Sequence, residues 1–185
     1  MRKLSAFIFL SLNGYYKDGQ NDISWHRHGT EENEFASDSM QQGNILLFGR
    51  ITYELMAGYW PAPMAIEQNA DVAAGMNQAS KIVFSRTLAK AEWHNTTIMK
   101  NNVIEEIRKM KETPGSDMTI LGSGTVVSQF AAHHLIDEFA LMIDPVILDK
   151  GTSLFSGIPV SQNLQLVNSR TFKSGAMLLQ YRPKT

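Results

Sequence analysis

Short apolar runs recur along the chain, with polar segments between them. The runs are rich in β-branched or aromatic residues and are too short for typical helices, which indicates strands buried on both faces. The predicted strands are residues 6–12, 44–48, 81–84, 96–99, 118–121, 139–148, 164–167 and 176–181.

Helical patterns lie between several of these runs. We expect helices over residues 51–59, 65–77 and 125–132, and another after Asn102, which is suited to an N-cap. The alternation of strands and helices predicts an α/β fold with a mostly parallel central sheet. The last third lacks a helical pattern, so we expect antiparallel strands there, with a hairpin in which Gly175 adopts a positive φ.

Composition narrows the classes of function. The chain has 185 residues, 43% of them hydrophobic, which suits a single domain over residues 1–185. A net charge of -1 indicates no nucleic-acid partner, and the absence of cysteine makes the reducing cytoplasm the expected location. The N-terminal apolar run is too short for a membrane span and lacks a cleavage site, so we interpret it as a strand and expect no membrane partner.

A first candidate anion site follows the strand at residues 44–48. Gly49 would let a ligand approach the backbone, Arg50 supplies a bidentate phosphate donor, and Thr52 supplies a hydroxyl at the start of a helix. A capped helix with a solvated arginine is the alternative.

A second such turn comprises Gly122, Ser123, Gly124 and Thr125, again between a strand and a helix. Its glycines and hydroxyl groups suit an anion, although Val127 stands where a Rossmann fingerprint has its third glycine. A tight structural turn is the alternative here.

A third strand end, at residues 81–84, leads into Ser85 and Arg86. Ligands of open α/β sheets bind beyond the carboxyl ends of strands, so the three strand ends together favour a phosphate ligand. Two arginines and two helix N-termini would hold a pyrophosphate and an additional 2′-phosphate.

The order of these blocks resembles the dihydrofolate reductase superfamily, in the branch that contains the reductase domain of riboflavin biosynthesis. The resemblance covers nearly the whole chain and rests on residues 11–15, 47–54, 85–87, 121–124, 135–138, 145–155 and 172–181. It implies a dihydrofolate-reductase-like three-layer sandwich that binds NADPH.

The resemblance also implies roles for individual residues. Gly49, Arg50 and Thr52 would contact the pyrophosphate and ribose phosphate, and Ser85 and Arg86 the adenosine side. The implied nicotinamide-side residues are Ala6, Asn13 and Gly14, and the implied glycine-rich turn is Gly122, Ser123, Gly124 and Thr125.

The substrate side departs from the family pattern. Dihydrofolate reductases carry a carboxylate on the first helix, whereas Asn33 falls near that place here, with glutamates around it. We expect Tyr16, Trp25 and Glu32 to bind substrate, with Trp25 on a lid over residues 21–35; a surface loop with a packed tryptophan is the alternative. No catalytic residue is assigned: water, Tyr16 and an acid near Glu32 are the possible proton donors.

These observations predict an NADPH-dependent reductase that transfers hydride directly to a C=N or C=O carbon of a small heterocycle. A riboflavin-pathway reductase of a ribosylaminouracil, and a nucleotide-binding protein without turnover, are the alternatives. We predict no metal, because His26 and His28 lack an evident third ligand. We expect a homodimer, because the run at residues 139–148 is long and apolar for an edge strand.

Overall fold

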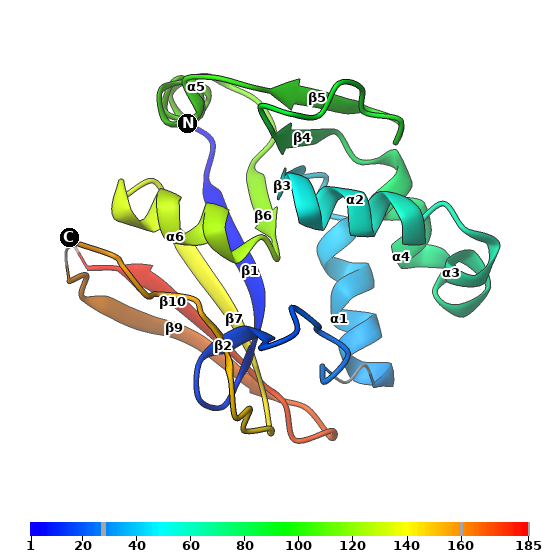
Figure 1. Ribbon diagram of the computed structural model, residues 1–185, viewed down its shortest axis with the longest axis vertical. Coiled ribbons are helices and arrows are strands. Elements are labelled where there is room, and N and C mark those ends of the chain that lie inside the picture. The colour runs from blue at the N-terminus through cyan, green and yellow to red at the C-terminus, as the bar shows by residue number, and fades with distance from the viewer. Residues whose placement is uncertain (27–28, 160, 185) are drawn as a thin grey trace. The chain divides into compact units, whose positions relative to one another are not determined.

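The computed structural model describes residues 1–26, 29–159 and 161–184. The chain divides into two compact units, the first made of residues 1–2 and 30–119 and the second of residues 3–29 and 120–185. Both units combine strands with helices, which confirms the predicted α/β class (Figure 1). Among the described residues, no helix combines the length and the apolar character that a membrane crossing requires.

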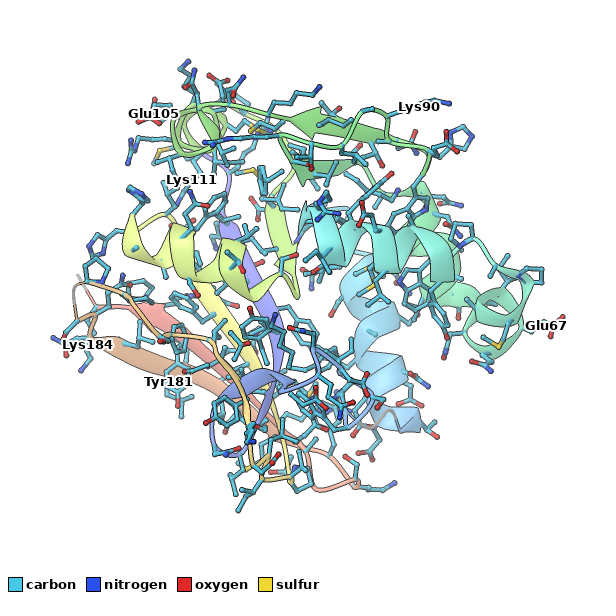
Figure 2. All side chains as sticks on the ribbon, in the orientation of Figure 1. Glu67, Lys90, Glu105, Lys111, Tyr181 and Lys184 are labelled. Atoms are coloured by element: carbon cyan, nitrogen blue, oxygen red, sulfur yellow. The ribbon has the colours of Figure 1, made fainter. Side chains whose placement is uncertain are left out.

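Parallel strands form the sheet of the first unit, in the order β5 (Thr96–Met99), β4 (Lys81–Phe84), β3 (Ile45–Gly49). Its helices are α1 (Thr30–Met40), α2 (Arg50–Tyr59), α3 (Pro63–Gln68), α4 (Ala70–Gln78) and α5 (Val103–Glu112). The helix predicted over residues 65–77 is therefore broken, at Asn69, whose φ of -148° and ψ of 65° are not helical. Charged pairs line the outside of α5, where Figure 2 labels Glu105.

The second unit contains β1 (Leu4–Ser11), β2 (Tyr15–Asp18), α6 (Gly124–Ala132), β7 (Glu138–Asp144), β8 (Gly151–Ser153), β9 (Leu164–Thr171) and β10 (Met177–Pro183). β1 pairs with β7 in parallel, whereas β10 is antiparallel to both β7 and β9, as expected for the last third. The hairpin between β9 and β10 turns at Gly175, whose φ is 89°, which confirms that prediction. A separate ribbon pairs β2 with β8, and β6 (Met118–Leu121) begins in the first unit and ends in the second.

The prediction that residues 139–148 form an edge strand is wrong. β7 ends at Asp144 and is paired along its length, with β1 on one side and β10 on the other. The apolar residues after Pro145 leave the sheet. The end strand on this side is β9, on which Leu166 and Val167 are 49% and 42% exposed.

The core of the second unit follows from the alternation along β1. Leu4, Ala6, Ile8 and Leu10 are buried, and the residues between them are partly exposed. The register with β7 runs from Ser5 opposite Glu138 to Ser11 opposite Asp144, so the two strands end at the same level.

Lys81, at the start of β4, is an unusual core residue because its ammonium group is buried. Its Nζ donates hydrogen bonds to the carbonyl oxygens of Asn77, Ala79 and His94 at 2.7–3.2 Å, and lies 4.5 Å from the ring centroid of Trp93. Burial lowers the pKa of Lys81 from 10.5 to about 8.

This lowered pKa predicts a rise in stability at alkaline pH. Between pH 8 and 10.5 the unfolded chain binds a proton at Lys81 that the folded chain does not, so the free energy of unfolding increases with pH, by about 3 kcal/mol over this range. Urea denaturation of the parent and Lys81→Met at both pH values checks this. The variant should lack the increase, and parallel pH profiles of the two proteins would contradict the assignment.

Candidate active site

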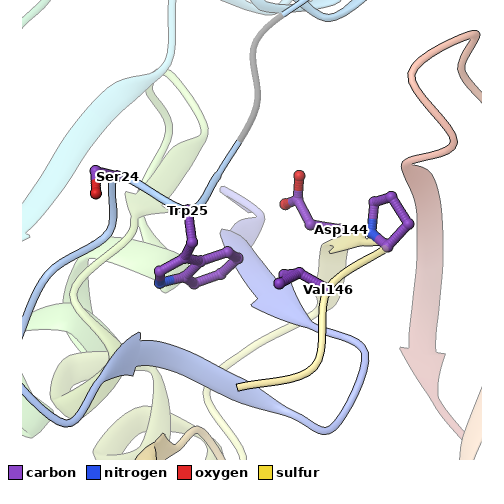
Figure 3. Close-up of a pocket in the computed structure, with 5 residues that line it drawn as sticks. Ser24, Trp25, Asp144 and Val146 are labelled. Carbon is purple, nitrogen blue, oxygen red and sulfur yellow. The ribbon is translucent and has the colours of Figure 1, made fainter. Parts of the chain in front are cut away.

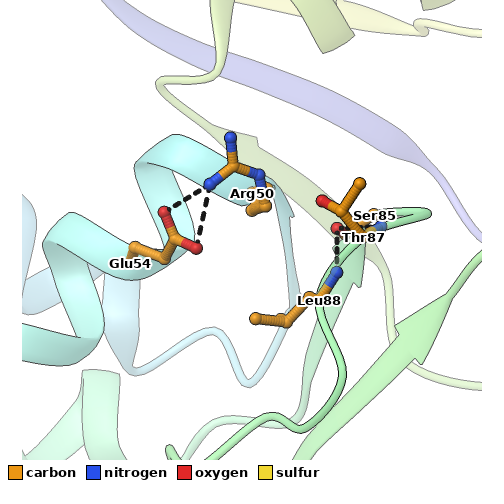
Figure 4. A network of polar contacts seen from close by, with 5 residues as sticks. All are labelled: Arg50, Glu54, Ser85, Thr87 and Leu88. Carbon is orange, nitrogen blue, oxygen red and sulfur yellow. Dashed lines mark hydrogen bonds and ion pairs between the residues drawn. The ribbon is translucent and has the colours of Figure 1, made fainter.

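In the first unit, the ends of β3 and β4 bring two of the predicted phosphate segments together. Gly49 lies opposite Phe84 in the parallel register, so Arg50 and Ser85 follow neighbouring strands at the same level. Figure 4 shows both residues at this edge, with Arg50 at the start of α2. The predicted proximity of these segments is therefore confirmed.

Both residues already have partners in this arrangement. Nη1 of Arg50 contacts both carboxylate oxygens of Glu54, at 3.0 and 2.8 Å, one turn along α2. Oγ of Ser85 accepts the backbone N–H groups of Thr87 and Leu88 and so shapes the turn after β4 (Figure 4). Because the Arg50–Glu54 pair is half exposed, it contributes little to stability. Arg50 can therefore leave Glu54 and bind a phosphate instead.

Other groups of the first unit differ in accessibility. Gly49 is the N-cap of α2 and makes no side-chain cap, so the helix start presents backbone N–H groups. Thr52 is half-buried in the first turn of the helix, and Arg86 is exposed. On α1, Glu32 is 5% exposed and Glu34 is exposed, so Glu32 is the glutamate that turns inward.

In the second unit, the glycine-rich turn has an unusual backbone. Gly122 and Ser123 are both left-handed, with φ of 56° and 52°. The Gly122 N–H donates to the Phe7 carbonyl of β1, and the hydrogen bonds within α6 begin with Val126 N–H donating to Ser123 O at 2.7 Å. The N–H groups at the start of α6, including that of Thr125, therefore belong to its first turn, which suits an anion.

Gly124 has a packing role that the sequence does not reveal. A Cβ on this residue would lie 2.5 Å from two atoms of the Tyr16 ring. The glycine therefore admits the Tyr16 side chain of β2, which accounts for it without any ligand.

The predicted nicotinamide-side residues hold the end of β1 in place. Ala6 is buried within the strand, and Gly14 turns the chain with a φ of 83°. The Asn13 side chain donates to the Leu148 carbonyl at 2.8 Å and accepts from the Leu148 N–H at 3.2 Å. The segment after β7 is thus fastened beside the β1–β2 turn.

The segment expected to be a lid is only partly a loop, because residues 30–35 belong to α1. The preceding residues form a turn held by two carboxylates. Asp18 Oδ1 accepts the Gln20 and Asp22 N–H groups, and Asp22 accepts those of Ile23 and Ser24 as well as the Ser24 hydroxyl. The Ser24 hydroxyl and backbone N–H bonds lower the pKa of Asp22.

A pocket of about 270 Å³ opens between this turn and the end of β7. Ser24 and Trp25 line one side, and Asp144, Pro145 and Val146 line the other. Figure 3 shows the Trp25 indole on one side of the pocket, with Val146 and Asp144 on the other. The indole N–H donates to the Asp22 carbonyl at 3.2 Å, which holds the ring at the wall.

Beside this pocket lies a buried pair that sequence reasoning missed. Nδ1 of His26 and Oδ2 of Asp144 are 2.6 Å apart, and both side chains are almost inaccessible. The imidazole stacks on Phe9, with ring centroids 3.4 Å apart. The sequence offered one signal for this pair: Asp144 is a carboxylate at the end of an apolar run, directly before Pro145. No group of three or more metal-ligating side chains occurs among the described residues; His28 lies outside them.

Comparison with known proteins places this arrangement in a class. The structure is similar to that of the dihydrofolate reductase of Enterococcus faecalis, solved with NADP(H), with a TM-score of 0.64 and 18% identity over 99% of this chain and 97% of that one. The chain therefore has a dihydrofolate-reductase-like fold, as the sequence predicts.

The particular family follows from the sequence match. The model of the RibD C-terminal domain matches residues 2–178, so the chain belongs to this family, a family of NADPH-dependent reductases. YyaP of Bacillus subtilis, an uncharacterized protein, is 28% identical over 97% of this chain and 94% of its own. A Thermotoga maritima deaminase and 5-amino-6-(5-phosphoribosylamino)uracil reductase shares the fold at a TM-score of 0.70 and 17% identity, over 99% of this chain and 57% of that one.

The contact of Gly124 with Tyr16 leads to a prediction. Gly124→Ala should lower the free energy of unfolding by about 1–3 kcal/mol, because the added methyl group overlaps the Tyr16 ring. In the Tyr16→Leu background the same change should cost much less, and urea denaturation of all four proteins measures the coupling. Gly58→Ala in α2 is the control, because no heavy atom lies within 4 Å of its added Cβ. Equal costs in both backgrounds would contradict the steric account.

Proposed function

We propose that this protein is an NADPH-dependent reductase of a small, flat, nitrogen-containing substrate. The observation that carries the proposal is the family match over residues 2–178, within which the chain has helix-starting turns at Gly49–Arg50 and Gly122–Thr125. When bound, the cofactor would supply hydride from C4 of its nicotinamide to a C=N or C=O carbon. The protein's own residues would bind and orient the cofactor and the substrate, and would exclude water from the site.

Each unit, taken by itself, contains residues that fit the chemistry of a phosphate group. In the first unit, Arg50 and the exposed Arg86 supply guanidinium groups, and Thr52 and Ser85 supply hydroxyls. In the second unit, the left-handed Ser123 precedes α6, whose first-turn N–H groups suit an anion. We assign the 2′-phosphate to the two arginines of the first unit.

Preference for NADPH over NADH tests the arginine assignment. Arg86→Ala should weaken NADPH binding by about tenfold or more and leave NADH binding unchanged, because one charge-assisted contact is lost. Glu54→Gln should strengthen NADPH binding, since Arg50 loses its competing carboxylate. Fluorescence titration measures both, with Lys90→Ala as the control because Lys90 is exposed and paired with Glu92 in the same segment. Equal affinities for the two cofactors would refute the assignment.

Turnover tests the function itself. NADPH oxidation should be observed with at least one member of a panel that contains a 5-amino-6-(ribosylamino)uracil, a dihydropterin and a simple cyclic imine. The ribosylaminouracil is the second candidate substrate, favoured by the family match and by the reductase named for the Thermotoga protein. Tight NADPH binding without oxidation by any member would indicate a nucleotide-binding protein instead.

We further propose a homodimer that forms through β9, the exposed end strand. An end strand with unpaired backbone groups and exposed apolar side chains tends to be covered, and a second copy of the chain is the simplest cover. Sedimentation should give a dimer at micromolar concentration, and Val167→Asp should shift it toward the monomer. A parent protein that sediments as a monomer would refute the proposal.

A further inference from the structure

The pocket beside Trp25 is lined by a carboxylic acid, Asp144, that is not among the proton donors considered so far. Asp144 is 1% exposed, yet it lines this pocket, at the carboxyl end of the parallel strand β7. Ligands of α/β proteins bind at such strand ends. Burying a carboxylate costs free energy unless the group is paired. A paired carboxylate at the wall of a pocket is therefore a candidate for a functional residue.

His26 is the partner that holds this carboxylate. Nδ1 and Oδ2 are 2.6 Å apart, a short hydrogen bond that fixes the Asp144 carboxyl group relative to the imidazole. The stack on Phe9 fixes the plane of the imidazole, and the backbone N–H of His26 donates to Ile23 at 3.1 Å. Protons bound to this pair are therefore held in one geometry beside the pocket.

The size and walls of the pocket indicate what it accepts. At about 270 Å³ it lies just below the range of about 300–1,000 Å³ that small-molecule sites occupy, so it suits a single ring rather than a dinucleotide. The indole of Trp25 supplies a flat apolar wall, and Asp144 supplies an acceptor or a proton. A nitrogen heterocycle the size of a pyrimidine matches both.

We propose that Asp144 is the proton donor of the reductase, that His26 is its positioning residue, and that the pocket beside Trp25 binds the nitrogen-containing ring of the substrate. This assignment rests on the proposed function. A new C–H bond forms with the hydride supplied by the cofactor, the C=N π pair becomes a lone pair on nitrogen, and that nitrogen takes a proton from the Asp144 carboxyl. Asp144 is left as a carboxylate hydrogen-bonded to His26, and a proton from water restores the acid.

Turnover of an isosteric variant tests the donor. Asp144→Asn should lower kcat by about 10²-fold or more and leave the Kd for NADPH within twofold, because general acid catalysis contributes about 10²–10⁴-fold. Asp149→Asn is the matched control, since Asp149 is exposed in the segment that follows β7. Glu32→Gln and Tyr16→Phe test the other donors, with the best substrate of the panel used throughout.

A binding measurement gives a readout that does not depend on turnover. The probe is 5,6-diaminouracil, the base contained in the compound named for the Thermotoga reductase. It should quench the emission that Trp25→Phe removes, and Asp144→Asn should raise its Kd about tenfold or more. For His26, Asn keeps a donor toward Asp144 whereas Phe keeps only the stack, so His26→Asn should retain more of kcat than His26→Phe. Near-UV circular dichroism confirms that each variant is folded.

The outcomes separate the two proposals. If the parent reduces a substrate and Asp144→Asn matches it in both kcat and probe affinity, the donor assignment is overturned and the reductase stands. Loss of turnover only in Glu32→Gln or Tyr16→Phe overturns it equally. If the parent oxidises no NADPH with any panel member, the proposed function fails and the assignment of a proton donor fails with it. Loss of turnover in Asp144→Asn, with turnover kept in Asp149→Asn, Glu32→Gln and Tyr16→Phe, supports the assignment.

Discussion

The parallel pairing of β1 with β7 determines where the residues of the pocket in the second unit lie. Because the register places Ser11 opposite Asp144, two segments distant in sequence leave the sheet at the same level. Two further links follow from this pairing: Leu12 N–H donates to Val146 O at 2.8 Å, and Asn13 bonds to both backbone groups of Leu148. A shift of one residue would turn Asp144 to the opposite face, away from His26. The pocket thus depends on a backbone register more than on any side chain that lines it.

Most of the architecture could be predicted because short apolar or β-branched runs bounded by polar segments mark the strands of a parallel sheet. The runs at residues 81–84, 96–99 and 118–121 match β4, β5 and β6 to the residue. The prediction failed where tertiary context decides. α1 has only Phe35, Ala36 and Met40 as apolar side chains, which are too few for a clear apolar stripe. β2 and β8 are short strands that pair with each other, so neither has a clear signal of its own in the sequence. The run at residues 139–148 was overlong because apolar residues continue past the point where Pro145 ends the strand.

The candidate site shows the same division. Strand ends that carry Arg50 and Ser85 are recognisable from local chemistry, and the parallel register alone brings them together. The reason for Gly124 could not be predicted, since it depends on a tyrosine more than a hundred positions away. His26 and Asp144, 118 residues apart, become a pair only through the fold. Each was visible in the sequence, but neither had a spacing or motif that connects it to the other.

The turn at residues 18–26 is stabilised differently from the sheet beneath it. Its backbone N–H groups are bound by the carboxylates of Asp18 and Asp22, with exposed side chains around them and little apolar burial. Segments with exposed hydrogen bonds and few buried apolar contacts open locally at a lower free energy than core strands do. The wall of the pocket that carries Trp25 can therefore open while β1 and β7 keep Asp144 in place, so a ring could enter the pocket without disturbing the sheet.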